Sequence, residues 1–408
     1  MGNILLVGSG GTATKGFVFK TILKKGLSIT LIDNGNSSFN RLVDHLIFKD
    51  PFTTSEWEDI LNEVKKVDKI SKITAVLPMS EFTVELASIL NEKLGLRGLN
   101  SSIAGLTRNK ARLREKMRDF NFNSPKFIEA DAYSFEKVKS FAGDTGYPLV
   151  IKPVDSGGSK GVYRCENIKD LESHFKLIFK NYNPSHVIIE EFIEGPEISA
   201  ETISQGGKIV FISLTEKVKV DDVNFVESGH VTPCDISDEK ANEVKLEAEK
   251  LLNMIQLHEG ISHIEFKLTQ KGPYIIEIGP RAAGAYLPDL IDLAYGINIF
   301  DLWIQSISSN KKIEVSPKIK QFAAVSFLYP TSGKVCSIPL PSSLNHKDID
   351  SLVDYGSYCK VGDTFNDKVT SNFDRIGHFV ITASNRGDLN HKNKTLSEEL
   401  TPSFNSRE

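Results

Sequence analysis

A lysine and a glycine-rich loop follow one another in residues 146–162, which read GYPLVIKPVDSGGSKGV. The apolar run Leu149–Ile151 between two prolines predicts a buried strand, and Lys152 near its end could reach a bound phosphate. Glycines allow the backbone N–H groups of the loop to point at an anion, helped by serine hydroxyls. The expected phosphate contacts are Lys152, Ser156, Gly157, Gly158, Ser159 and Gly161. The alternative for this stretch is a flexible surface hairpin.

Two glutamates further along the chain could hold a metal ion. Glu265 lies in HIEFK and Glu277 in YIIEIGPR, and the polar turn between these runs predicts a hairpin. Two ionised carboxylates close together and away from bulk water need a cation. Mg²⁺ suits them because it binds few carboxylates together with substrate phosphates, and Mn²⁺ is the alternative ion. The pair could instead be exposed edge-strand acids with lysine partners such as Lys267.

The order of these features resembles the ATP-grasp superfamily. A lysine strand, a glycine loop, an acidic hinge in residues 187–199 (VIIEEFIEGPEIS) and two carboxylates on neighbouring strands occur in that order, and the likeness is strongest from Lys110 to Arg281. The resemblance implies a hinge that reads the adenine edge, an acid that holds the ribose and a first lysine that contacts ATP. These roles fall to Glu190, Glu191, Phe192 and Ile193 for adenine, Glu197 for ribose and Lys110 for ATP. Composition alone would make Lys110 one of several solvated charges on its helix.

The sequence departs from the commonest pattern of the superfamily, Glu-x-Asn-x-Arg. Here the corresponding run is Glu277-Ile278-Gly279-Pro280-Arg281, so Gly279 removes the side chain of a third metal ligand. A second Mg²⁺ would then be bound more loosely. Arg281 remains, and its guanidinium can stabilise an acyl-phosphate and the charge on a tetrahedral intermediate.

Two further polar residues could face a substrate. His230, in FVESGHVTP, could contact a substrate carboxylate or remove a proton from an ammonium group, and a structural histidine is an equal alternative. Glu81 follows a predicted strand, where open α/β sheets bind ligands, and it could equally compensate a helix dipole.

The first residues predict a βαβ unit and therefore a parallel sheet. Asn3–Val7 and Leu27–Ile32 are apolar runs that flank a glycine turn, Gly8–Gly11, and a helical pattern. The turn could bind a nucleotide, but its spacing is not GxGxxG, and we favour helix packing or contact with a substrate carboxylate.

Composition limits the classes of protein that fit. The 408 residues carry 49 basic and 53 acidic side chains, which gives no basic face for nucleic acid. The four cysteines form no CxxC pair, no stretch is apolar enough for a membrane span, and the N-terminus lacks a secretory signal. We therefore expect a reducing, cytoplasmic setting and no nucleic-acid or membrane partner, with a homodimer left open.

We expect an α/β (α+β) chain of the ATP-grasp type. The predicted parts are an N-terminal parallel-sheet domain at 1–105, an ATP-grasp domain with a central antiparallel sheet at 106–310, and a β-rich module at 311–385. The lid of the ATP-grasp domain is expected at about 125–190. Residues 386–408 are polar, and we expect them to form a disordered tail.

The resemblance implies an ATP- and Mg²⁺-dependent ligase that joins a small-molecule carboxylate to an amine through an acyl-phosphate. Within the superfamily the chain looks most like the L-amino-acid ligases that make dipeptides, because of GSKGV, FVESGHVTP and DRIGHFVI. One alternative is a member that activates bicarbonate, as carboxylases do. Another is a nucleotide-binding regulatory module without chemistry, a possibility that Gly279 raises.

Overall fold

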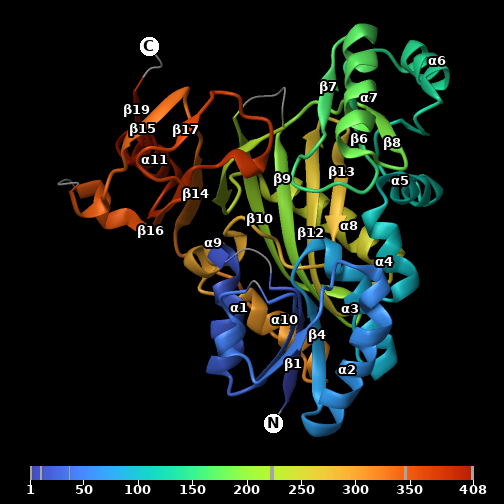
Figure 1. Cartoon of the computed structure of the whole chain (residues 1–408), viewed down its shortest axis with the longest axis vertical. Helices are drawn as coiled ribbons and strands as arrows, with labels where there is room; N and C mark the ends of the chain where they lie inside the picture. The colour runs from blue at the N-terminus through green and yellow to red at the C-terminus, as the bar shows by residue number, and fades with distance from the viewer. Residues whose placement is uncertain (1, 10–11, 36, 221–224, 344–346, 406–408) are drawn as a thin grey trace.

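The N-terminal part is a four-stranded parallel sheet, described here from a computed structural model that covers residues 2–9, 12–35, 37–220, 225–343 and 347–405. The strand order is β3-β2-β1-β4, with strands β1 (Asn3–Val7), β2 (Ser28–Asp33), β3 (His45–Phe48) and β4 (Ile73–Pro78). Helices α1 (Thr12–Lys24), α2 (Trp57–Ile70) and α3 (Val84–Leu94) connect and cover it (Figure 1).

Both faces of this sheet are buried, which explains the unbroken apolar run of β1. Ile4 and Leu6 pack in one cluster with side chains of α1, and Leu5 and Val7 pack in another with side chains of α2 and α3. The predicted βαβ unit is confirmed. Gly10 and Gly11 of the glycine turn lie outside the described residues. Ser9 donates from its backbone N and its Oγ to Asp33 Oδ2 (3.0 and 2.7 Å), which ties the start of the turn to β2.

A small antiparallel sheet lies at the opposite end of the molecule (Figure 1). Its order is β5-β8-β6-β7, and helices α6 and α7 pack on it. The bounds are β5 (Phe127–Ala130), α6 (Phe135–Thr145), β6 (Leu149–Pro153), β7 (Tyr163–Cys165), α7 (Ile168–Tyr182) and β8 (Val187–Glu191). Helices α4 (Ser101–Arg108) and α5 (Lys110–Asp119) lead into it from the N-terminal sheet. The predicted strand before the glycine loop is β6, buried along its whole length.

An eight-stranded sheet forms the centre of the molecule, in the order β13-β12-β9-β10-β11-β14-β18-β16. The strands are β9 (Glu197–Gln205), β10 (Lys208–Lys219), β11 (Glu227–Thr232), β12 (Gly260–Thr269), β13 (Gly272–Gly279), β14 (Phe322–Leu328), β16 (Leu352–Ser357) and β18 (Gly377–Ala383). Helix α8 (Asp238–Met254) packs on one side, while α9 (Leu287–Tyr295) and α10 (Ile299–Ser308) lie between the central and N-terminal sheets (Figure 1). The predicted hairpin is confirmed as β12 and β13, which are antiparallel.

The C-terminal region continues the central sheet through β14, β18 and β16 and adds a three-stranded sheet, β17-β15-β19. The remaining strands are β15 (Gly333–Ser337), β17 (Thr364–Phe365) and β19 (Ser403–Asn405). Short 3₁₀ helices lie at η1 (Asn40–Leu42), η2 (Thr54–Glu56), η3 (Glu81–Thr83), η4 (Pro341–Ser343), η5 (Lys347–Ser351) and η6 (Asn372–Asp374). The mixed α/β class is therefore confirmed. No described helix has both the length and the apolar content needed to cross a bilayer.

The expectation of a disordered tail from residue 386 is wrong for the described part of that segment. Helix α11 (Arg386–Leu400) buries Leu389, Leu396 and Leu400 in the C-terminal core, and β19 pairs with β15. The apolar residues are few, but they recur at helical spacing, so one narrow face suffices to anchor the helix. Asn385 caps it by accepting a hydrogen bond from the backbone N of Asp388.

Candidate active site

A cavity of about 1060 Å³ lies where the three regions meet. The N-terminal sheet contributes Met79–Phe82, the glycine loop forms one wall, and strands of the central sheet form what we call the floor. The predicted residues that line this cavity are Lys110, Lys152, Ser156, Gly157, Gly158, Ser159, Glu190, Glu191, Phe192, Ile193, Glu197, Glu265, Glu277 and Arg281. Gly161 and His230 are not among the lining residues.

Glu265 and Glu277 stand directly opposite each other on β12 and β13. Directly paired positions of an antiparallel ladder share one face of the sheet, so both carboxylates reach the cavity. Lys110 Nζ lies 3.2 Å from Glu277 Oε1 and donates to the carbonyl oxygen of Ser156 at 2.6 Å. This lysine therefore links the floor to the start of the glycine loop.

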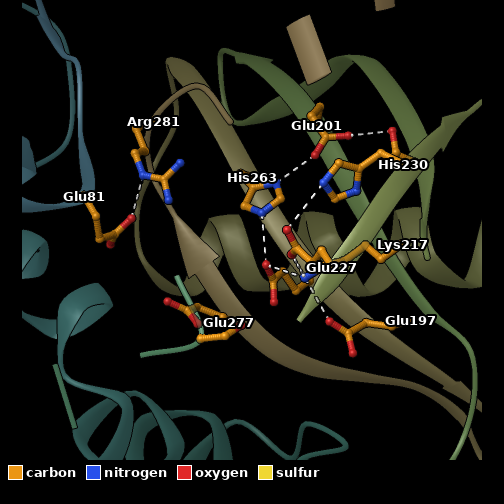
Figure 2. Close-up of polar contacts among 12 residues, drawn as sticks. Glu81, Glu197, Glu201, Lys217, Glu227, His230, His263, Glu277 and Arg281 are labelled. Atoms are coloured by element: carbon orange, nitrogen blue, oxygen red, sulfur yellow. Dashed lines mark hydrogen bonds and ion pairs between the residues drawn. The ribbon is translucent and has the colours of Figure 1, made fainter. Parts of the chain in front are cut away.

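Lys217 on β10 is surrounded by three carboxylates. Its Nζ lies 2.8 Å from Glu197 Oε1, 2.9 Å from Glu227 Oε1 and 2.8 Å from Glu265 Oε1 (Figure 2). Burial alone would lower the pKa of this ammonium, but the three carboxylates raise it well above its usual value. Burial would likewise raise the pKa of Glu197, but Lys217 and neighbouring lysines lower it to about 2. The pKa values of Glu197, Glu227 and Glu265 all lie below the usual range, so these three acids are ionised and Lys217 offsets part of their charge.

His263 was not singled out by sequence reasoning, and it bridges two of these acids. It faces Glu201 across the β9–β12 ladder, with Nδ1 2.7 Å from Glu201 Oε1, and its Nε2 lies 3.2 Å from Glu265 Oε1 (Figure 2). Burial would lower the pKa of His263, but the hydrogen bonds to Glu201 and Glu265 raise it to about 9. The signal in the sequence is the two-residue spacing of His263 and Glu265, which places both on one face of a strand.

The floor carboxylates suit a hard divalent cation. Glu265 and Glu277 offer oxygen donors on adjacent strands, and the cavity beside them is open to a phosphate-bearing ligand. Among the described residues no group of three or more His, Cys, Asp or Glu side chains is placed to hold a metal. The arrangement therefore fits Mg²⁺ completed by substrate oxygens rather than a site made by the protein alone.

The hinge strand β8 carries a buried ion cluster. Glu190 Oε1 accepts from Arg114 Nε at 2.6 Å, and its Oε2 lies 2.5 Å from Lys152 Nζ. Burial would raise the pKa of Glu190, but Arg114 and Lys152 lower it to about 2. Sequence reasoning treated the charges of α5 as mostly solvated, yet Arg114 is fully buried and also donates to the carbonyl oxygen of Ile276 at 2.7 Å. The cluster fixes the hinge to α5 and to the floor.

Most backbone donors of the hinge are already used. The N–H of Glu191 donates to Lys126 O at 2.9 Å, and that of Phe192 donates to Pro148 O at 3.2 Å. The Ile193 N–H makes no hydrogen bond with the described residues, and Ile193 lines the cavity. Of the four residues expected to contact adenine, Ile193 is therefore the one whose N–H remains for a ligand.

The glycine loop makes few contacts. Gly158 and Ser159 have positive φ angles of 67° and 60°, so the chain turns sharply between them. Ser159 Oγ donates to the carbonyl oxygen of Phe225 at 3.0 Å, which holds the loop against the segment that precedes β11. Gly161 is buried behind the lining residues, where a side chain would meet Tyr182.

His230 lies behind the cavity wall. It is 3% exposed, its Nε2 is 3.5 Å from Glu227 Oε2, and neither ring nitrogen has a hydrogen-bond partner among the described residues. Glu227 stands between His230 and the cavity, and it also receives Arg375 Nη2 at 3.2 Å. The side chain that presents itself to a ligand here is therefore Glu227 rather than His230.

Arg281 is held by Glu81, which lies just after β4. The Nε of Arg281 donates to Glu81 Oε2 at 2.6 Å (Figure 2). Its Nη1 donates to Ala282 O at 3.0 Å. Both Glu81 and Arg281 line the cavity. Glu81 therefore faces the site, which was one of the two interpretations of its position after β4.

Comparison with known proteins finds one family model and several similar proteins. Residues 145–289 match a family model described as an ATP-grasp domain. The chain is similar to an uncharacterised protein of Sinorhizobium fredii, 25% identical over 60% of this chain and 51% of that protein, so the match spans about half of its length. It is similar to an alanine–anticapsin ligase of Bacillus amyloliquefaciens, 23% identical over 84% of this chain and 80% of that protein. Its fold resembles the crystal structure of an L-amino acid ligase from Bacillus licheniformis, with a TM-score of 0.83, 20% identity and coverage of 100% and 99% of the two chains.

Proposed function

Because residues 145–289 carry an ATP-grasp domain, we propose that this chain is an ATP-dependent ligase that joins a carboxylate to an amine and releases ADP and phosphate. One observation carries the proposal: in a single cavity, Lys110 and the glycine loop face the paired carboxylates Glu265 and Glu277. Cationic and amide donors on one wall and acids on the other suit a triphosphate with its metal ion.

Each group has a place in the reaction. Lys110 and the N–H groups of the loop would bind the phosphates, and Glu265 and Glu277 would hold Mg²⁺, which when bound would neutralise charge on the transferred phosphoryl group. A carboxylate oxygen of the first substrate attacks the γ-phosphorus, the bond to the β-phosphate oxygen breaks, and ADP leaves. An amine then attacks the acyl carbon, loses a proton, and phosphate departs. Arg281, which lines the cavity, would stabilise the developing oxyanion.

We infer that the carboxylate substrate is an amino acid. The printed names of the similar proteins, an alanine–anticapsin ligase and an L-amino acid ligase, support this class. The region beyond Glu265 also supports it, because Glu227 and Arg375 place opposite charges side by side and Asn372 adds an amide, with Glu227 and Asn372 lining the cavity, as recognition of a zwitterion requires. The product would then be a dipeptide or a related amide.

The test is release of ADP from Mg-ATP with pairs of L-amino acids, with the amide product identified by mass spectrometry. Turnover that needs both a carboxylate and an amine supports the proposal. Turnover stimulated by bicarbonate and not by any amino acid would replace it with carboxylase-type chemistry. Binding of Mg-ATP without turnover over a broad panel of acids and amines would indicate a regulatory module.

A further inference from the structure

The backbone conformation of Gly279 does not require a glycine, but the side chains around it leave little room for a Cβ. Gly279 is the last residue of β13, and its φ angle lies outside the positive region that favours glycine. A Cβ at this position would lie 2.9 Å from Glu81 Oε2 and 3.5 Å from side-chain atoms of Arg281, so the end of the flexible Glu81 side chain would have to move away from its place beside Arg281. The carboxylate of Glu81 therefore fills the space that a side chain at position 279 would need.

The same carboxylate oxygen is the one that binds Arg281. Glu81 Oε2 accepts from Arg281 Nε at 2.6 Å, and the backbone N–H of Arg281 donates to the carbonyl oxygen of Gly279 at 2.8 Å. Side-chain exposure is 13% for Glu81 and 22% for Arg281, so the ion pair is largely removed from solvent. The three residues form one contact unit, although Glu81 and Arg281 are 200 positions apart.

The N-terminal domain holds Glu81 firmly. Met79 directly follows β4, and its N–H donates to Val7 O at 3.1 Å. Thr83, two residues after Glu81, is fully buried, and its Oγ1 accepts from the backbone N of Ser80 at 3.2 Å. A short helix fixed at both sides positions the carboxylate more precisely than a mobile loop would.

The two hydrogen bonds of Arg281 leave part of its guanidinium for a ligand. Nε is taken by Glu81 and Nη1 by Ala282 O, whereas Nη2 makes no hydrogen bond with the described residues. Fixing one edge of a planar guanidinium determines where its other edge points. Arg281 lines the cavity, so its unbound edge is available to a substrate there.

We propose that Glu81 is a positioning residue for Arg281 and that Gly279 is required to make room for it. This inference rests on the proposed function and adds a part of the molecule to it: the N-terminal domain sets the orientation of the arginine that stabilises the reacting carboxyl group. Gly279 is then a condition for activity rather than only the loss of a metal ligand.

The experiment compares G279A, E81A, E81Q and the double variant G279A/E81A. We expect E81A and G279A each to lower kcat by about 100-fold, the scale of a misplaced catalytic group, while the KM for ATP and the affinity for Mg-ATP measured by calorimetry stay within about twofold. In the double variant, the second substitution adds little, because the contact is already lost. E81Q, whose amide oxygen can still accept from Nε, retains most of the activity.

The control is G143A. Gly143 lies in α6, nothing lies within 4 Å of the place that a Cβ would take there, and its φ angle is not positive. We expect this variant to keep the kcat of the wild type. Thermal unfolding of every variant checks that the fold is intact.

The outcomes separate the inference from the proposed function. Effects of G279A and E81A on kcat that multiply in the double variant would overturn the inference while leaving the ligase activity established. A fully active G279A or E81A enzyme would do the same. A wild-type enzyme that releases no ADP with any acid and amine would overturn the proposed function, and the inference would go with it.

Discussion

The floor of the cavity and the glycine loop that forms one of its walls differ in how firmly the protein holds them. On the floor, the carboxylates of Glu197, Glu227 and Glu265 are fixed by Lys217 and by the hydrogen-bonded ladders of β9, β10, β11 and β12. The glycine loop between β6 and β7 is held by little more than the contacts of Ser156 and Ser159. The side chains of the floor are ordered by contacts within the protein, whereas the loop makes few such contacts and can form new ones with a ligand.

This difference follows from what each wall has to do. Groups that stabilise a transition state act best when they are already in place, because no reorganisation is then needed at the moment of reaction. A loop that covers phosphates has to let the nucleotide enter and ADP leave, and weak local contacts permit this. Substitutions in the floor should therefore damage chemistry and stability, whereas substitutions in the loop should have smaller and more local effects.

The largest expected effect is loss of turnover in E277A. Removal of one of the paired carboxylates takes away a donor to the metal ion, and we expect kcat to fall by about 1000-fold or more, as for the loss of a main electrostatic group. The measurement is ADP release with saturating amino acids. E243A, which removes an exposed acid from α8, should keep full activity. Substantial turnover by E277A would refute the metal role of the floor.

The next effect is on stability. K217M leaves three buried carboxylates without their shared ammonium, and removing one partner of a buried ion cluster costs about 3–5 kcal/mol. Urea unfolding of K217M should show this loss, and K180M, at an exposed position of α7, should show almost none. If K217M were as stable as the wild type, the floor would not depend on its internal cation.

A smaller, pH-dependent effect is expected at the hinge. The pKa of Glu190 is lowered from 4.5 to about 2 by Arg114 and Lys152 against the cost of burial, so its contribution to stability is complete above pH 4.5 and is lost as the pH falls toward 2. E190Q should be less stable than the wild type at neutral pH, and the difference should shrink over that acidic range. Urea unfolding between pH 7 and about 2.5 measures it. A difference that stays constant with pH would contradict the assignment.

The smallest effects on stability are expected in the glycine loop, where substitutions of two adjacent glycines can be compared. Gly158 has a positive φ angle and a side chain there would meet Phe373 at 3.3 Å, whereas Gly157 has open space and an ordinary φ angle. G158A should cost about 1–2 kcal/mol, the strain of a left-handed conformation, and G157A should cost almost nothing. Thermal unfolding compares them. Equal losses would show that the loop relaxes around the added methyl group instead of holding the left-handed conformation of Gly158.

Local patterns made much of this site predictable. The apolar run before the glycine loop, the hairpin that carries Glu265 and Glu277, and the acidic hinge are each continuous in the sequence, and the structure places them around one cavity. Short-range periodicity and turn residues are sufficient for such elements.

Contacts between distant segments were not predictable in the same way. Arg114 is one of several charged residues on α5, and only the tertiary fold makes it the buried partner of Glu190. The pairing of Glu81 with Arg281 depends on how the N-terminal sheet meets β13, which no local pattern encodes. Helix α11 was missed because three leucines on one face are a weak compositional signal, although they are enough to anchor it.

The shared ammonium of Lys217 has a consequence for how this protein can evolve. Three acids depend on one lysine, so a lineage that changes Glu227 to accept a new substrate still keeps its other two acids paired with that cation. Replacement of the lysine removes a cation from all three acids at once and leaves them separate contacts such as those with Lys219, Arg375 and His263. Drift should therefore accumulate among the acids that face the substrate while the cation between them stays the same.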